Sequence, residues 1–221
     1  MTMLRPLAAL PEYDTIPGPL WLIVILHLLT LTLHFAAMNF MLGGIVIVLF
    51  GRIENRWHNP TVKRYIKLFP TLMAATVTLG VAPLLFAQLT YGGPIYSASI
   101  VSGWWWFLIP IVVIVAYYFL YGAAFARQGN PKVRSWLLVA FLGLLYVSVI
   151  YSGVFSLAED PALQKTMYEG AQDGLVFNPD VGAWLPRWLH MMTGAVTVGA
   201  FFFGWIAKND EKAFAAAKTF Y

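Results

Sequence analysis

The chain has 221 residues, of which 60% are apolar, 16% aromatic and 11% charged, and its formal net charge is +4. A mean hydropathy of +0.70 excludes an ordinary soluble domain and indicates an integral membrane protein. The sequence contains no cysteine, which excludes disulfides, thiolate zinc sites, iron–sulfur clusters and a covalently attached c-type haem on this chain.

Five stretches lack ionised side chains and reach the roughly 20 residues needed to cross a hydrocarbon core of about 30 Å. The first is longer than necessary, so we expect it to tilt or to extend into a headgroup region. No charged residue occurs between Lys67 and Arg127, and Tyr91-Gly-Gly-Pro94 is expected to form the turn that separates two spans there. The sequence therefore predicts an all-α integral membrane protein with a single domain over residues 1–221. Its bundle of five transmembrane helices is expected at about 20–50, 69–91, 104–126, 135–157 and 187–207.

Lysine and arginine residues gather on one side of these spans. Eleven of the fourteen lie in segments 51–68 and 127–134 and in the tail after residue 207. The positive-inside rule then predicts an N-terminus outside, a cytoplasmic C-terminus and a multi-pass protein of the cell inner membrane. No cleavable signal peptide is expected, because the run 20–50 is too long for one. The opposite side carries three cations and most of the acids, namely Arg5, Lys165, Arg187, Glu12, Asp14, Glu159, Asp160, Glu169, Asp173 and Asp180.

Three histidines lie within the apolar spans. His27 and His34 are seven residues apart in the first span, so both project from one helix face at axial positions roughly 10 Å apart. His190 lies near the start of the last span. Ring nitrogens in hydrocarbon need a partner, and two imidazoles from different helices are the usual ligands of a low-spin b-type haem. His27 and His190 are the first choice of axial pair, since both are expected near the outer surface, and His34 is the candidate ligand of a second haem.

Other residues near these histidines suit the same cofactor. Arg187 precedes His190 by one helical turn and is a candidate partner for a haem propionate, although a snorkelling arginine is the alternative. Small residues at Gly43-Gly44, Gly194 and Gly199 allow close approach of either a flat macrocycle or a neighbouring helix. Each histidine has an interhelical hydrogen bond as its alternative role. His58, in a charged loop, is expected to be solvated.

Several segments resemble subunit I of the cytochrome bd quinol oxidases. Leu33-His-Phe-Ala-Ala-Met-Asn-Phe-Met-Leu-Gly43 is similar to the first helix of that family, with a His-Phe pair followed by Leu-Gly at the same spacing. The likeness continues in order and spacing along the family's second helix, and then in its helix that carries a low-spin haem ligand and the cytoplasmic stretch after it. It covers nearly the whole chain but only the N-terminal half of the family's subunit. The matching segments are Leu68-Phe-Pro70, Gly80-Val-Ala82, Tyr91-Gly92, Trp188-Leu-His-Met-Met-Thr-Gly-Ala-Val-Thr-Val-Gly-Ala-Phe-Phe202 and Ala213-Phe-Ala-Ala-Ala-Lys218.

The resemblance implies that His34 is the family's haem-ligating histidine on the first helix and that His190 is its low-spin haem b ligand. His27 has no counterpart in the family. Gln88 and Ser102 stand at positions where the family has acidic residues. Those acids resemble parts of a proton route to the oxygen-reducing site of the family. Reduction of dioxygen by this chain alone is therefore not expected.

These observations predict a membrane cytochrome subunit with one or two haems b and no catalytic residue of its own. It would transfer electrons between the quinone pool and an extracytoplasmic or partner redox subunit of a respiratory complex, with a c-type cytochrome as one candidate partner. No nucleic acid is implied. The acidic outer loop 158–186 is either a docking surface for a basic partner or an ordinary solvated loop. The alternatives are part of a bd-type quinol-dependent terminal oxidase and a haem-free membrane scaffold or assembly subunit.

Overall fold

The computed structural model describes residues 18–220, and every regular element within that range is a helix. Long helices are expected of apolar segments without charge, because a helix satisfies its own backbone hydrogen bonds in lipid. Five helical segments are long and apolar enough to cross a membrane, which is the organisation of a multi-pass membrane protein. In chain order the helices are α1 (Leu20–Phe50), η1 (Arg56–His58), α2 (Pro60–Ile66), α3 (Phe69–Val101), α4 (Gly103–Phe125), α5 (Lys132–Ala158), α6 (Pro161–Gly170), α7 (Val181–Ile206) and α8 (Glu211–Lys218).

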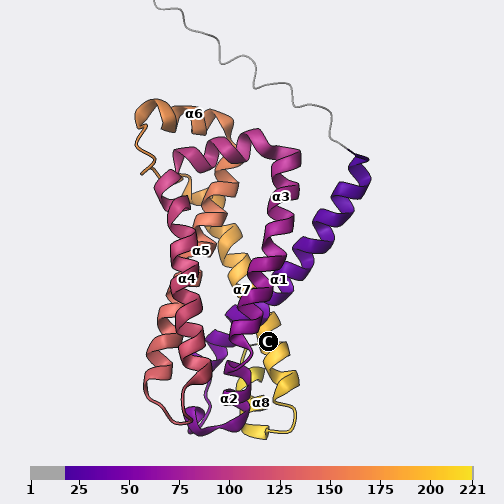
Figure 1. Ribbon diagram of the computed structural model, residues 1–221, viewed down its shortest axis with the longest axis vertical. Coiled ribbons are helices and arrows are strands. Elements are labelled where there is room, and N and C mark those ends of the chain that lie inside the picture. Colours follow the sequence, from indigo (N-terminus) through magenta and orange to yellow (C-terminus); the bar gives the residue numbers. More distant parts are fainter. Residues whose placement is uncertain (1–17, 221) are drawn as a thin grey trace, which may run out of the picture.

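The long helices run along the length of the molecule, and the short helices lie at its two ends (Figure 1). Helix α6 lies at one end, called here the α6 end, and α2 and α8 lie at the other, the α2–α8 end. The largest fully buried side chains, Tyr65, Phe69 and Phe203, belong to one cluster that includes residues of α2 and α8. The best-packed part of the bundle is therefore near the α2–α8 end.

Helix α1 leaves the bundle over its N-terminal half (Figure 1). This half exposes most of its large apolar side chains, including Trp21, Ile25 and Leu28, whereas the segment Met41–Ile45 is buried. The observed bounds of α1 match the predicted span 20–50. Because these side chains are apolar, lipid or another membrane-embedded helix is the medium that suits this surface.

Helices α1 and α7 cross at glycines. A Cβ on Gly43 would lie 2.2 Å from the carbonyl oxygen of Ala195, and a Cβ on Gly199 would lie 2.6 Å from Cα of Gly43. Two of the glycines noted in the sequence thus serve the approach of a neighbouring helix. Gly44 makes room for the ring of Tyr65 instead.

The predicted separation of two spans at Tyr91–Pro94 takes the form of a helix kink and not of a loop. Helix α3 continues to Val101, with a kink at Tyr91 (φ −132°, ψ 28°), and its last part bends across the α6 end before α4 begins (Figure 1). Pro94 has no N–H for the i−4 carbonyl and its ring crowds that carbonyl, which kinks a helix without ending it. Gly92 and Gly93 are buried at the bend. Helix α3 is consequently longer than the predicted 69–91, but the part of it that runs along the length of the molecule ends at the kink (Figure 1).

The last span also begins earlier than predicted, at Val181 in place of residue 187. The carboxylate of Asp180 accepts a hydrogen bond from the Ala183 backbone N–H (3.0 Å) and caps α7. The predicted outer loop 158–186 is therefore partly helical, since it contains α6 and the first turn of α7. The N-terminal residues Arg5, Glu12 and Asp14, assigned above to the outer side, lie outside the described residues.

Candidate functional site

His34 is held in one orientation by α3. Its Nδ1 lies 2.8 Å from the carbonyl oxygen of Thr76, and because a carbonyl only accepts hydrogen bonds, Nδ1 carries the proton and donates it. A Cβ on Gly80 would lie 2.8 Å from both Nδ1 and Cε1 of this ring, so the glycine provides the space for it. The remaining nitrogen, Nε2, is left with its lone pair, which is the arrangement of most metal-ligating histidines.

His27 lies on the same side of α1 as His34, also toward α3. Its ring packs edge-on against the ring of Phe86, with 6.4 Å between the centroids. Among residues 18–220, its buried Nδ1 has no hydrogen-bond partner. A buried polar atom without a partner is costly, and such atoms in native structures often mark a ligand or ion.

His190 lies on a face of α7 that the described part of the chain does not cover. The side chains of His190 and Thr193 are exposed, and a Cβ on Gly194 would meet no atom within 4 Å. The Thr193 hydroxyl is satisfied within the helix by the carbonyls of Leu189 (3.0 Å) and His190 (2.9 Å). This face therefore presents an imidazole beside open space.

The crossing of α1 and α7 sets the relative heights of the histidines. Both helices run from the α6 end to the α2–α8 end (Figure 1). His34 precedes Gly43 by nine residues, and His190 precedes Gly199 by nine residues. His34 and His190 therefore lie at similar heights above the crossing, whereas His27 is about 10 Å farther along the axis of α1. Nine residues are also about two and a half helical turns, so each of the two imidazoles lies on the face of its helix opposite the crossing, and the structure does not bring them together.

No three His, Cys, Asp or Glu side chains within residues 18–220 are grouped so as to hold a bare metal ion. A haem iron, by contrast, takes only one or two ligands from the protein, because the macrocycle supplies the other four. The oriented Nε2 of His34, the orphaned Nδ1 of His27 and the open face beside His190 fit a haem b and do not depend on such a cluster.

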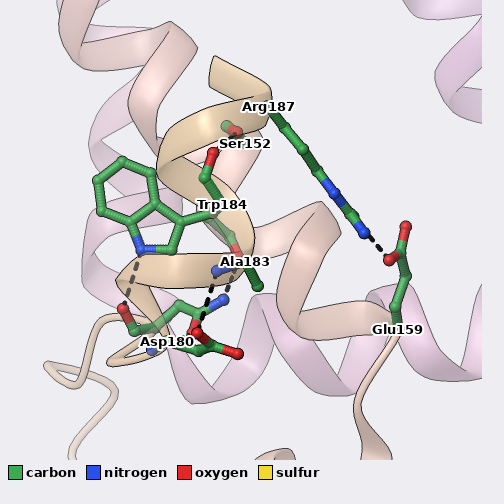
Figure 2. A network of polar contacts seen from close by, with 8 residues as sticks. Ser152, Glu159, Asp180, Ala183, Trp184 and Arg187 are labelled. Atoms are coloured by element: carbon green, nitrogen blue, oxygen red, sulfur yellow. Dashed lines mark hydrogen bonds and ion pairs between the residues drawn. The ribbon is translucent and has the colours of Figure 1, made fainter. Parts of the chain in front are cut away.

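Arg187 is paired with a carboxylate at the α6 end (Figure 2). Its Nη1 lies 2.6 Å from Oε2 of Glu159, and both side chains are more than half exposed. The pair borders a cavity of about 210 Å³ that Asp160, Asn178 and Asp180 also line. Figure 2 shows this pair beside the start of α7, where Ser152 donates to the carbonyl of Trp184 (3.2 Å). The guanidinium keeps further donors besides the one that Glu159 uses.

The two positions that lack the acids of the resembled family lie on or just after α3. Gln88 is half-buried three residues before the kink at Tyr91. Ser102 is fully buried between α3 and α4, and its Oγ has no hydrogen-bond partner in the described range. His58 is exposed in η1 at the α2–α8 end, in agreement with the expectation of a solvated residue.

Three features of the site had no clear signal in the sequence. The hydrogen-bond acceptor of Thr76 is its backbone carbonyl, so the residue type at position 76 does not indicate it. The role of Gly80 depends on the direction of the His34 ring. Glu159 is one of several outer acids, and only the fold shows that it pairs with Arg187.

Comparisons with protein-family models, with curated proteins and with solved structures find no match to this chain.

Proposed function

We propose that this chain is a haem b-binding membrane cytochrome subunit, related to the N-terminal half of subunit I of the cytochrome bd quinol oxidases. The observation that carries the proposal is the tether of His34. An imidazole whose Nδ1 donates to a backbone carbonyl and whose Nε2 is free is prepared to bind a metal inside the membrane. Haem b would supply reversible one-electron transfer at this position.

We propose His34 and His190 as ligands of two separate haems, because their imidazoles lie on the faces of α1 and α7 that point away from the crossing of these helices. His27, with its unpartnered Nδ1, is a further candidate ligand on the α3 side of α1. The three predicted ligands are retained, but the predicted axial pairing of His27 with His190 is not, because His27 faces α3.

The surrounding residues would orient the cofactor and protect it from water. Thr76 fixes the plane of the His34 ring, Gly80 gives that ring its space, and Gly194 leaves room beside His190. Arg187 is positioned one helical turn before His190, and its spare donors suit a propionate, although Glu159 shares the guanidinium.

Electrons would pass between the lipid-soluble quinone pool and a second redox subunit of a respiratory complex. The α6 end carries a cluster of acids, including Glu159, Asp160 and Asp180 around the outer cavity, which suits a basic extracytoplasmic partner such as a c-type cytochrome. We place this end outside the inner membrane and the cation-rich α2–α8 end in the cytoplasm, on the basis of the positive-inside rule.

The test is a haem count on ligand variants of the purified chain with any bound partners. Reduced-minus-oxidised spectra and a pyridine haemochrome assay are recorded for His34→Ala, His190→Ala and His27→Ala, with His58→Ala as the matched control. We expect the control to keep all haem, and His34→Ala and His190→Ala each to lose a different haem. Loss of a single common haem in both variants would contradict separate sites, and loss of haem in His27→Ala would make His27 a ligand as well.

The two alternatives predict other results. A folded preparation without haem, or histidine variants that all keep wild-type spectra, would contradict the cytochrome proposal and favour a scaffold. Oxygen consumption by the intact complex that stops when this chain is removed would favour a part of a terminal oxidase. The Gln88 and Ser102 positions argue against that role, because neither side chain is an acid.

A further inference from the structure

The α2–α8 end carries a large excess of positive charge. Eleven cations lie in the segments at this end, against the three acids Glu54, Asp210 and Glu211. Within the part of the chain that is described, the only ion pair at this end joins Lys212 to Glu54 (2.5 Å). The remaining cations at this end have no carboxylate of residues 18–220 within ion-pair distance.

Two of these cations bind backbone carbonyls at helix ends. Arg56 donates to the carbonyls of Val48 (3.0 Å) and Gly51 (2.5 Å) and so closes the C-terminus of α1. Lys63 donates to Ala124 (2.9 Å) and Ala126 (2.6 Å) at the C-terminus of α4. Such carbonyls favour a cation but carry no full charge, so the positive charge of both side chains is not neutralised.

Further cations surround these two. Arg134 directly follows Val133, which lines a small hollow together with Arg56. Burial and the charge of Arg134 both lower the pKa of the Arg56 guanidinium. Arg127 and Lys63 line the same small hollow as Arg56, between α2 and the α4–α5 connection. We call Arg56, Lys63, Arg127 and Arg134 the basic rim.

An exposed apolar surface lies next to the basic rim. Phe125, at the end of α4 and two residues before Arg127, is 80% exposed, and Tyr121 stacks on it with 5.8 Å between the ring centroids. Leu138, one turn along α5 from Arg134, is exposed as well. The rim thus places cations beside exposed aromatic and aliphatic side chains at the ends of membrane helices. Such a surface is complementary to a molecule with an anionic head and hydrocarbon tails.

We propose that the basic rim binds the phosphate of an anionic phospholipid whose acyl chains lie against Phe125 and the neighbouring surface of α4 and α5. The rim lies at the ends of membrane-spanning helices, which is the level of lipid headgroups. A soluble phosphate would use the cations but not the exposed apolar surface. This inference is independent of haem binding.

The experiment uses the full chain in a neutral detergent, with native mass spectrometry to count bound lipid. Dioleoylphosphatidylglycerol is titrated against dioleoylphosphatidylcholine, and inorganic phosphate is added as a competitor. We expect phosphatidylglycerol to be retained in preference to phosphatidylcholine and to resist millimolar phosphate. The variant Arg127→Gln/Arg134→Gln should weaken its binding by about fivefold for each cation removed.

The matched control is Lys208→Gln/Lys218→Gln, which removes two exposed cations from the same end but outside the rim. We expect it to bind phosphatidylglycerol like the wild type. An equal loss in both double variants would show a diffuse charge effect and overturn the site. Equal retention of the two lipids, or displacement of phosphatidylglycerol by free phosphate, would overturn it too. Both rim arginines in the variant are exposed, so folding is not expected to change.

Discussion

At the scale of single residues, His34 is the best-defined element of the proposed site. One hydrogen bond to the Thr76 carbonyl fixes its tautomer, and the missing side chain at Gly80 fixes its position. His27 and His190 lack such a tether in the described range, but each has a nitrogen or a face without a partner. The two candidate positions thus differ: the one at His34 is prepared between α1 and α3, and the one at His190 is an open face of α7.

The space at Gly80 gives a direct test at this scale. In Gly80→Ala the new methyl would lie 2.8 Å from the His34 ring, and the hydrogen bond to Thr76 keeps the ring from moving away easily. We expect loss of the haem that His34 binds, or a marked shift of its absorption bands and potential. The control is Gly170→Ala, where a Cβ meets nothing within 4 Å. Unchanged spectra in Gly80→Ala would show that the ring position does not matter for haem.

At the scale of helices, the crossing of α1 and α7 sets the relative heights of His34 and His190, which lie on the faces of their helices opposite the crossing. The contact is backbone to backbone, with a Cβ on Gly199 only 2.6 Å from Cα of Gly43, so neither position accepts a side chain without separating the helices.

Gly199→Ala should therefore destabilise the protein by roughly 1–3 kcal/mol, the usual cost of overpacking. Gly194→Ala, five residues earlier on the same helix, adds its methyl to open space and should be neutral or slightly stabilising in the haem-free protein. Thermal unfolding in detergent compares the two. Equal melting temperatures for both variants would refute the close crossing.

Helix α8 is attached to α2 through Asp210. This carboxylate accepts hydrogen bonds from the Ala213 N–H (3.0 Å) and from the Asn59 side-chain amide (2.9 Å). Partial burial raises its pKa, but these hydrogen bonds, together with those from Thr61 and Lys212, outweigh that effect, and the pKa lies below its ordinary value. A carboxyl group with a lowered pKa stabilises the folded state above its ordinary pKa, and this stabilisation is lost as the pH falls through the lowered value.

Asp210→Ala should cost about 1 kcal/mol of local stability at neutral pH, as the loss of a helix cap usually does. Asp210→Asn should keep most of the cap and lose the acid-dependent part. Hydrogen exchange of the α8 amides, corrected for the intrinsic effect of pH, measures both. If α8 in Asp210→Asn loosens in acid as much as the wild type does, Asp210 is not the titrating group.

The helices themselves were largely predictable from the sequence, and their irregularities were not. Uninterrupted apolar runs define α1, α4 and α5, because length and hydropathy alone decide whether a segment can span. The course of α3 beyond Tyr91 depends on whether a Gly-Gly-Pro sequence bends a helix or ends it, and burial of both glycines favours the bend. The early start of α7 depends on the N-cap at Asp180. The sequence placed Asp180 in a loop and did not indicate that it caps a helix.

At the scale of the whole molecule, the two ends differ in the sign of their charge. Cations gather at the α2–α8 end, and the described acids Glu159, Asp160, Glu169, Asp173 and Asp180 gather toward the α6 end. The histidines were predictable as candidate ligands, because an imidazole in an apolar span is unusual. The directions in which they face were not predictable, since these depend on where the helices cross.

Orientation in the membrane can be measured because the sequence has no cysteine. Lys165→Cys on α6 and Lys218→Cys on α8 each introduce one thiol at an exposed position. A membrane-impermeant maleimide applied to intact cells should label residue 165 only, and residue 218 should react only after lysis. The reverse pattern would contradict the proposed topology.

The most direct test of the central claim is the haem content of the wild-type chain, purified with any bound partners in mild detergent. A pyridine haemochrome assay, together with dithionite-reduced minus oxidised spectra, should give at least one haem b per chain with sharp low-spin bands. A well-folded preparation that carries no haem would contradict the account.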